Sequence, residues 1–183
     1  MNFSNNIKVS DFTIKDTKPM YSNQSWTGQR IVRDTGIQYY EISFVLNFNI
    51  ENRGEVQTFL AQYQHGRPFS MSLGYYGTYA GKQTGGLVAS AQTGKGNMVV
   101  NTNNKLAVGE LVQFTNHKKI YQVIERTDTS ITVFPALQNI VLVNEPIIYE
   151  NIEIEAVLNP DNEYQMQVGM ITSIKLNAME NIV

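Results

Sequence analysis

The sequence predicts a mainly β protein in which a sheet that carries one helix is interrupted by a small antiparallel barrel. Three observations predict this fold: an alternating apolar pattern over residues 41–50, a helical pattern over residues 52–65, and five short strand-like runs between residues 98 and 149. The 183 residues are enough to bury the core of one domain or of two small ones.

The first 36 residues predict short, irregular elements. Residues 1–22 mix brief apolar alternations with polar side chains, and Pro19 interrupts them, so we expect an edge strand or an arm that reaches to a neighbouring chain. Residues 22–28 (SNQSWTG) predict a turn-rich loop that holds the only tryptophan, Trp26. Residues 29–33 predict a short strand, and residues 34–36 (DTG) predict the turn that follows it.

Residues 41–50 (EISFVLNFNI) predict a half-buried strand, because every second side chain is apolar. The apolar period then changes to that of a helix over residues 52–65, where the apolar face consists of Val56, Phe59, Leu60 and Tyr63. We expect Asn52 and Glu55 to form a capping box at the start of this helix. Gly66 is expected to end it in the left-handed conformation.

The chain then predicts one more strand and a change of character. Pro68 prevents the helix from continuing, and residues 69–73 (FSMSL) alternate as a strand. Residues 74–104 are rich in glycine and predict a flexible connection into a new unit.

The new unit is predicted to be a small antiparallel barrel, because short strand-like runs recur at even spacing between turn signals. These runs are residues 98–100, 106–114, 119–125, 130–134 and 141–149. After them the alternating pattern returns at residues 151–159 and 164–176, joined by the turn residues 159–162 (NPDN), which suit a short hairpin. We therefore predict a sheet domain from residues 1–82 and 150–183, with a barrel inserted at residues 83–149.

Composition excludes several classes of function. The formal net charge is −2, without a run of Lys or Arg, which argues against a nucleic-acid binder or a membrane-surface protein. There is no cysteine, so disulfides, thiolate metal sites and cysteine nucleophiles are excluded. The amino terminus does not resemble an export signal, and no apolar run approaches the roughly 20 residues that span a bilayer. We expect folding in a cytoplasm without a membrane anchor.

The sequence offers few groups for catalysis, so we expect no enzyme, no metal and no cofactor. His65 is placed at the end of the helix and His117 in a turn, and neither has the spacing of a metal ligand. Glu153 and Glu155 share one face of a strand, where they are expected to mark its solvent or subunit side. Lys95 follows Thr-Gly but lacks the remaining residues of a phosphate-binding loop.

Three tyrosines form the strongest interaction signal. Tyr75, Tyr76 and Tyr79 lie together on a glycine-rich segment without a basic residue before Lys82. Aromatic side chains in this setting suit a protein contact or a sugar-binding platform better than the stacking of nucleic-acid bases. They could equally close the end of a β-sandwich, and the sequence leaves these readings open.

Several phrases in the chain resemble bacteriophage tail proteins of the distal-tail and tail-tube type. They are Trp26-Thr27-Gly28 before a long strand, the strand EISFVLNF, the helix that ends in Gln64-His65-Gly66, and the strand RPFSM at residues 67–71. Residues 108–137 (VGELVQFTNHKKIYQVIERTDTSITVFPAL) resemble the small barrel domains inserted in phage minor and distal tail proteins. The resemblance extends from about Trp26 to Leu176.

This resemblance implies a β-sandwich with one flanking helix that assembles as six-membered rings around the tail channel. It implies a structural virion protein at the tail tip or baseplate, assembled in the host cytoplasm, with the tail tube, hub and fibre or collar proteins as partners. DNA would only pass through the lumen, and no membrane is involved. The family has no active-site motif to transfer to this sequence.

Two other functions stay open at this point. A carbohydrate-binding module would use Trp26 with Tyr75, Tyr76 and Tyr79 to stack on sugar rings. An enzyme is the third alternative, for which Glu153 would be the residue to test.

Overall fold

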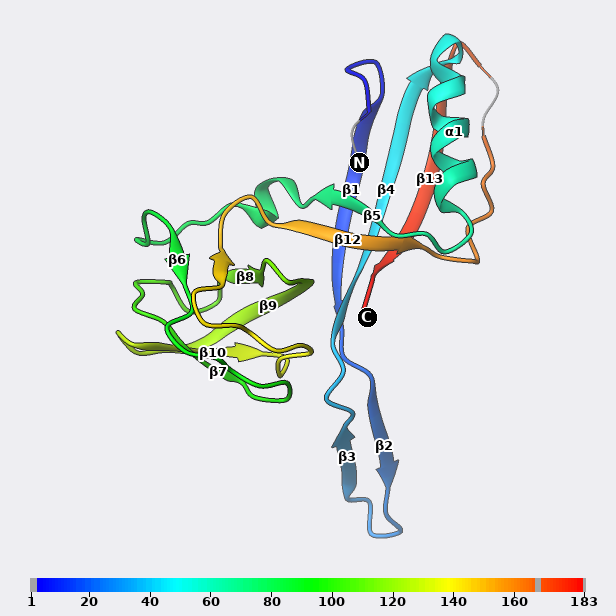
Figure 1. The fold of residues 1–183 in the computed structure, drawn as a ribbon. Coiled ribbons are helices and arrows are strands. Elements are labelled where there is room, and N and C mark those ends of the chain that lie inside the picture. Colours follow the sequence, from blue (N-terminus) through cyan, green and yellow to red (C-terminus); the bar gives the residue numbers. More distant parts are fainter. Residues whose placement is uncertain (1–2, 167–168, 183) are drawn as a thin grey trace. The chain divides into compact units, whose positions relative to one another are not determined.

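The computed structural model describes residues 3–166 and 169–182 and divides the chain into two compact units (Figure 1). Unit 1 comprises Met1–Ser70 and Glu155–Val183, and unit 2 comprises Met71–Ile154. The sequence predicts limits at residues 83 and 149 for the inserted domain, whereas unit 2 begins at Met71 and ends at Ile154. The described residues are mainly β, with a single α-helix, so the predicted mainly β fold class with one helix is confirmed.

Unit 1 is built on a five-stranded sheet with the order β1-β4-β13-β12-β5. Its strands are β1 (Lys8–Thr17), β4 (Tyr39–Asn49), β13 (Ile171–Glu180), β12 (Glu153–Leu158) and β5 (Phe69–Ser72). The central strand β4 is antiparallel to both β1 and β13. The sheet therefore combines strands from both ends of the chain, as the sequence predicts.

The predicted strand at residues 41–50 is confirmed as β4, with its alternation preserved. Ile42, Phe44, Leu46 and Phe48 are buried, whereas the side chains between them are half-buried. On β13, Leu176 lies opposite Phe44. Residue 50 is no longer in the strand, because it begins a short 3-10 helix, η1 (Ile50–Asn52).

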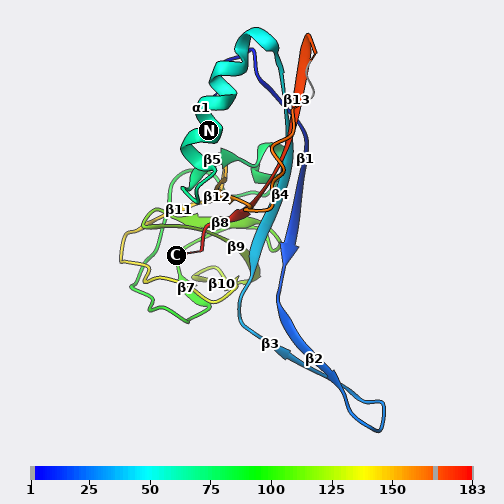
Figure 2. The same ribbon diagram turned by 90° about the vertical axis from the view of Figure 1, so that its right-hand side faces the viewer.

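Helix α1 (Arg53–Tyr63) covers one face of this sheet, as Figure 2 shows edge-on. Its buried residues are Val56, Phe59 and Leu60, which confirms the apolar face predicted from the sequence. Phe59 meets Phe69 of β5 edge-to-face, with ring centroids 5.3 Å apart. Aromatic pairs of this geometry add to the stabilisation from burial of the rings.

The predicted capping box at the start of α1 is wrong. The side chain of Asn52 makes no capping hydrogen bond. The carboxylate of Glu55 instead accepts hydrogen bonds from the backbone N–H and the hydroxyl of Ser4, both at 2.7 Å. Ser4, which lies 51 residues earlier in the chain, thus takes the place of Asn52 as the hydrogen-bond partner of Glu55. At the other end, Gly66 has the expected positive φ of 82°.

The amino-terminal region forms two elements. β1 is an edge strand of the sheet, which confirms one of the two expectations for residues 1–22, and its pairing with β4 is irregular between Ser10 and Thr13. β2 (Met20–Gln24) and β3 (Arg30–Asp34) form a separate antiparallel hairpin. The predicted loop at residues 22–28 is therefore shorter, because residues 22–24 pair with β3.

The predicted short hairpin after β12 is also wrong. The turn at residues 159–162 exists, since Asn162 N–H donates to the Asn159 carbonyl at 3.2 Å. However, β13 begins only at Ile171, and β12 pairs with its far end, where Leu158 lies opposite Ala178. Of the predicted strand at residues 164–176, Gln167 and Val168 lie outside the described residues. The Asn162 side chain binds the backbone of Asn177 and holds this turn against β13.

Unit 2 contains a curled six-stranded antiparallel sheet with the order β6-β11-β8-β9-β10-β7. Its strands are β6 (Leu87–Val88), β11 (Pro146–Ile148), β8 (Leu111–Phe114), β9 (His117–Arg126), β10 (Ser130–Phe134) and β7 (Val99–Asn101). The strand predicted at residues 130–134 is confirmed as β10, with the same first and last residues. The predicted strands at 106–114 and 141–149 are too long, because turns at Gly109 and Asn144, both with positive φ, interrupt them.

Residues 74–104 contain more structure than the predicted flexible connection. The 3-10 helix η2 (Gly74–Gly77) and strands β6 and β7 lie within them. β6 pairs with β11, almost 60 residues later in the chain, and such a distant partner leaves no local signal.

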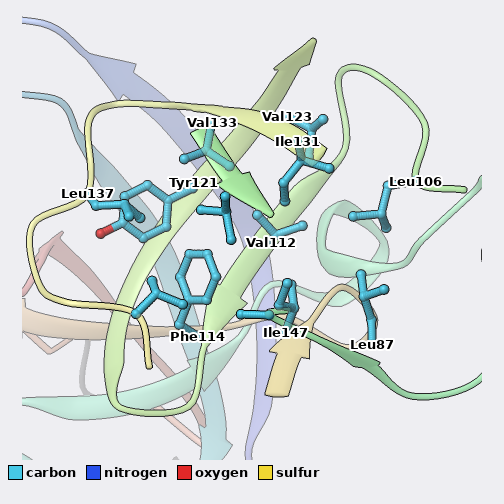
Figure 3. Close-up of a cluster of buried hydrophobic side chains, with 13 residues drawn as sticks. Leu87, Leu106, Val112, Phe114, Tyr121, Val123, Ile131, Val133, Leu137 and Ile147 are labelled. Carbon is cyan, nitrogen blue, oxygen red and sulfur yellow. The ribbon is translucent and has the colours of Figure 1, made fainter. Parts of the chain in front are cut away.

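The two outer strands of this sheet are linked, so that the sheet closes into a small barrel. Ser90 N–H donates to the Asn101 carbonyl at 2.7 Å, and the Thr102 hydroxyl donates to the Val88 carbonyl at 2.8 Å. Figure 3 shows the side chains that fill the interior, with Tyr121 beside Phe114. Their rings meet edge-to-face at 5.6 Å.

Candidate functional site: a protein-interaction surface

The hairpin β2–β3 is the most exposed of the strand pairs in the described residues. Every residue of both strands is exposed. Figures 1 and 2 show the hairpin continuing from the paired strands β1 and β4. A two-stranded hairpin is only marginally stable in water, and exposed apolar surface of this extent commonly marks a contact with another molecule.

The tip of the hairpin is ordered and presents the only tryptophan. Trp26 is fully exposed. The turn beneath it is closed by Ser25, whose carbonyl accepts from Gly28 N–H at 2.9 Å and whose hydroxyl accepts from Gln29 N–H at 3.1 Å. Gly28 has φ +82°, a conformation that favours glycine. A fixed turn keeps the indole available without a large ordering cost on binding.

Both faces of the hairpin carry apolar and aromatic side chains. Residues paired across the strands share a face, so Tyr21, Arg33 and Ile31 lie on one side. Met20 and Val32 lie on the other. Aromatic residues, Met and Arg are the types enriched at protein interfaces. The hairpin therefore has the composition of an interface on both sides.

An apolar groove lies where the hairpin joins the sheet of unit 1. The groove has a volume of about 530 Å³ and is lined mainly by Ile37, Tyr39, Val157, Met179 and Ile182. Ile37 directly follows Gly36, whose N–H is fixed by the Asp34 carboxylate at 2.9 Å. We call this the apolar groove.

The face of the sheet opposite α1 is polar. Ser43 and Asn47 alternate with the buried residues of β4. On the same face Glu41 accepts hydrogen bonds from Lys15 at 3.1 Å and from Thr17 at 2.9 Å. The bond from Lys15, and then that from Thr17, lower the pKa of the Glu41 carboxyl below its ordinary value.

The three candidate tyrosines do not share one environment. Tyr75 and Tyr76 are exposed on η2, whereas Tyr79 is half-buried and meets Tyr149 edge-to-face at 5.0 Å. The Tyr79 hydroxyl also accepts from Gln83 N–H at 3.1 Å. All three belong to unit 2, whereas Trp26 belongs to unit 1.

The prediction that His117 is a turn residue is wrong, because it is the first residue of β9 and is half-buried. The Tyr121 hydroxyl accepts from Gln138 N–H at 3.0 Å, so its own hydrogen can be donated to His117 Nε2 at 2.9 Å. Burial lowers the pKa of His117, and the Glu145 carboxylate opposes this effect. This arrangement favours the neutral imidazole.

The other ionisable residues singled out in the sequence lie apart. His65 is exposed just after α1, beside Gln64. Glu153 is exposed and Glu155 is half-buried. Ile152, which precedes Glu153, and Ile154, which lies between the two glutamates, are buried, as predicted. Within residues 3–166 and 169–182, no three His, Asp or Glu side chains are grouped so that they could hold a metal ion.

The one α-helix of this part of the chain, α1, is too short to cross a membrane.

No protein-family model matches the chain, and no curated protein sequence matches it. The candidate interaction surface therefore rests on its geometry and composition alone. Sequence reasoning found Trp26 and the strand that became β3, but it missed β2. The residues 20–24 (MYSNQ) do not alternate, and only their pairing with β3 makes them a strand.

Proposed function

We propose that this chain is a structural virion protein, a ring subunit at the distal end of a bacteriophage tail that joins the tail tube to the baseplate hub or fibres. The observation that carries the proposal is the hairpin β2–β3, whose strands are exposed on both faces. An element with this composition gains stability when another molecule covers it. The resemblance of residues 26–176 to distal-tail proteins supports the phage-tail setting and a ring of six.

In this proposal, the hairpin of one copy packs on the apolar groove of the next. Such a head-to-tail contact uses two different surfaces, and repeated contacts of this type form rings when the rotation closes. Trp26 and Val32 supply exposed apolar area, and Ile37 and Met179 of the neighbour supply the groove. The edge strand β1 offers a second surface for pairing.

The polar face of the sheet suits the lumen of such a ring. Its neutral side chains Ser43, Asn47, Ser173 and Asn177 are in register across β4 and β13. Lys8, Lys15 and Lys175 also lie on this face, opposite Asn47, Glu41 and Val45, and Lys15 is paired with Glu41. The positive charge on the face is therefore scattered, which favours weak attraction for DNA that passes through the ring. The chain has no catalytic role in this proposal.

The experiment is light scattering with negative-stain imaging over a range of concentrations. We expect six-membered rings to appear as the concentration rises. Val32→Ser in the hairpin should raise the concentration needed for assembly, by about tenfold if one buried valine is lost at each contact. Val99→Ser is the matched control, because Val99 of β7 has the same residue type and nearly the same exposure, 50% against 49% for Val32.

A strict monomer at every concentration contradicts self-assembly into a ring. Equal effects of Val32→Ser and Val99→Ser contradict the role of the hairpin. A glycan array on the same samples tests the second function, since binding that is lost in Trp26→Ala, with assembly unchanged, would favour a carbohydrate-binding module.

A further inference from the structure

A second groove lies on the barrel of unit 2 and carries an excess of positive charge. Its volume is about 620 Å³, and its lining includes Lys82, Lys105 and Arg126 but a single carboxylate, Asp128. None of these three cations has an ion-pair partner among the described residues. We call it the cationic groove. The excess of positive charge is confined to the groove, because unit 2 as a whole has as many acidic as basic residues.

A buried asparagine fixes two walls of the cationic groove. Asn104 donates from its side chain to the carbonyls of Thr127 and Ser130, at 3.2 and 3.3 Å. Its side-chain oxygen accepts from Leu106 N–H at 3.2 Å, and its own N–H donates to the Asp128 carbonyl at 3.2 Å. The segments that carry Lys105 and Asp128 are thus held together by one satisfied polar group.

The third wall is fixed by Tyr79 and Gln83. Gln83 Oε1 accepts from Lys105 N–H at 2.6 Å, and the Tyr79 hydroxyl lies against the same segment, 3.4 Å from the Lys105 carbonyl. Tyr79 also covers Gly81, where an added Cβ would lie 2.1 Å from the phenol oxygen. Only glycine fits beneath this ring. The groove is therefore formed before any ligand binds, which lowers the ordering cost of binding.

We propose that the cationic groove binds an acidic peptide segment of a partner protein. The three cations attract carboxylates, and the guanidinium of Arg126 can bind one in a bidentate manner. Exposed Val108 offers a place for an apolar side chain, and Asp128 can accept from a peptide N–H or amine. A volume of this size lies in the usual range for binding pockets.

Two features argue against a nucleic acid or a phosphate polymer in this groove. The described residues that line it include no aromatic side chain, whereas single-stranded nucleic acids depend on stacking against aromatic rings. Asp128 would also repel a continuous row of phosphates. The proposal concerns the barrel alone and does not rest on the ring proposed above.

The test measures fluorescence anisotropy of the full chain with a labelled octapeptide of alternating Glu and Val. The matched probe is an octapeptide of alternating Gln and Val. We expect tighter binding of the Glu peptide, weakening as salt is added, because exposed charges are screened. Lys105→Glu should weaken binding by about tenfold, since it replaces an attraction with a repulsion.

Lys95→Glu is the matched control, because Lys95 is exposed on the same unit outside the groove and the substitution changes the net charge equally. We expect its affinity to stay within about twofold of the unchanged chain. Equal weakening by Lys95→Glu, equal binding of the Gln and Glu peptides, or absence of binding would overturn the proposal. Binding of a thymidine octanucleotide that is as tight and as sensitive to Lys105→Glu would overturn it in favour of a phosphodiester ligand.

Discussion

The hairpin β2–β3 and the barrel strand β10 contain similar residues but bury them to opposite extents. In β3, Ile31 and Val32 are adjacent, so their side chains point to opposite faces of the hairpin and both are exposed. In β10, Ile131 and Val133 are separated by Thr132, so both point to one face and both are fully buried. The order of the residues, more than their type, decides which strand builds a core.

This difference indicates which part of the molecule is complete by itself. The barrel closes over its own core, so the apolar residues of that core need no partner. The hairpin has no face that could be covered from within the two strands, and its stability depends on contacts outside them. Four predictions test this contrast, beginning with the largest expected effect.

Ile131→Ala should destabilise the barrel unit by about 2–5 kcal/mol, because it leaves a cavity among closely packed side chains. Ile131 is fully buried in the core of unit 2. Hydrogen exchange of amides in β8, β9 and β10 measures the loss. Protection that stays unchanged in these strands would contradict the view that the barrel depends on this core.

Asn104→Ala should cost about 1–3 kcal/mol, because the buried Leu106 N–H loses its acceptor and the Thr102 carbonyl loses the donor in its buried bond with Asn104. Urea denaturation of the variant measures the change in the free energy of unfolding. Asn103→Ala is the control, since Asn103 is the exposed neighbour in the same segment. Similar losses for the two variants would show that the hydrogen bonds of Asn104 do not stabilise the fold.

Acidification below the ordinary pKa of histidine should destabilise the barrel through His117. Its pKa is lowered in the folded state, so the unfolded chain takes up the proton first and the free energy of unfolding falls as the pH falls. The loss is complete below the folded-state pKa. Melting temperatures between neutral and mildly acidic pH should show a smaller decrease in His117→Gln than in the unchanged chain.

His65→Gln is the control for this measurement, because His65 is exposed outside the barrel. It tests whether the loss of any histidine, and not of His117 in particular, changes the decrease in melting temperature. A decrease that persists in His117→Gln would assign the effect to groups other than His117.

Ile31→Ala should change the free energy of unfolding by no more than about 0.5 kcal/mol at concentrations where the chain is monomeric. The Ile31 side chain is 58% exposed and is not part of a buried core. The substitution of isoleucine by alanine is thus expected to cause the largest loss of stability in β10 and the smallest in β3. A loss close to that of Ile131→Ala would mean that the hairpin is covered within the monomer, and the contrast would fail.

Part of the interaction surface could be anticipated from the sequence. Trp26 stood out as the only tryptophan, and residues 29–33 were predicted to be a strand. The hairpin itself could not be found, because β2 is a strand only through its pairing with β3. The cationic groove was missed for a related reason, since Lys82, Lys105 and Arg126 come from three separate segments that Asn104 and Gln83 bring together.

The sequence by itself determined the elements whose residues repeat at a regular period. The alternation of β4 and β10 and the apolar face of α1 are local patterns, and burial requires them to face one way. Tertiary structure decided the features that depend on distant partners, among them the contact of Glu55 with Ser4 and the pairing of β6 with β11. A hydrogen bond between segments far apart in the chain forms only after the chain has folded, so the residues on either side carry no periodic trace of it.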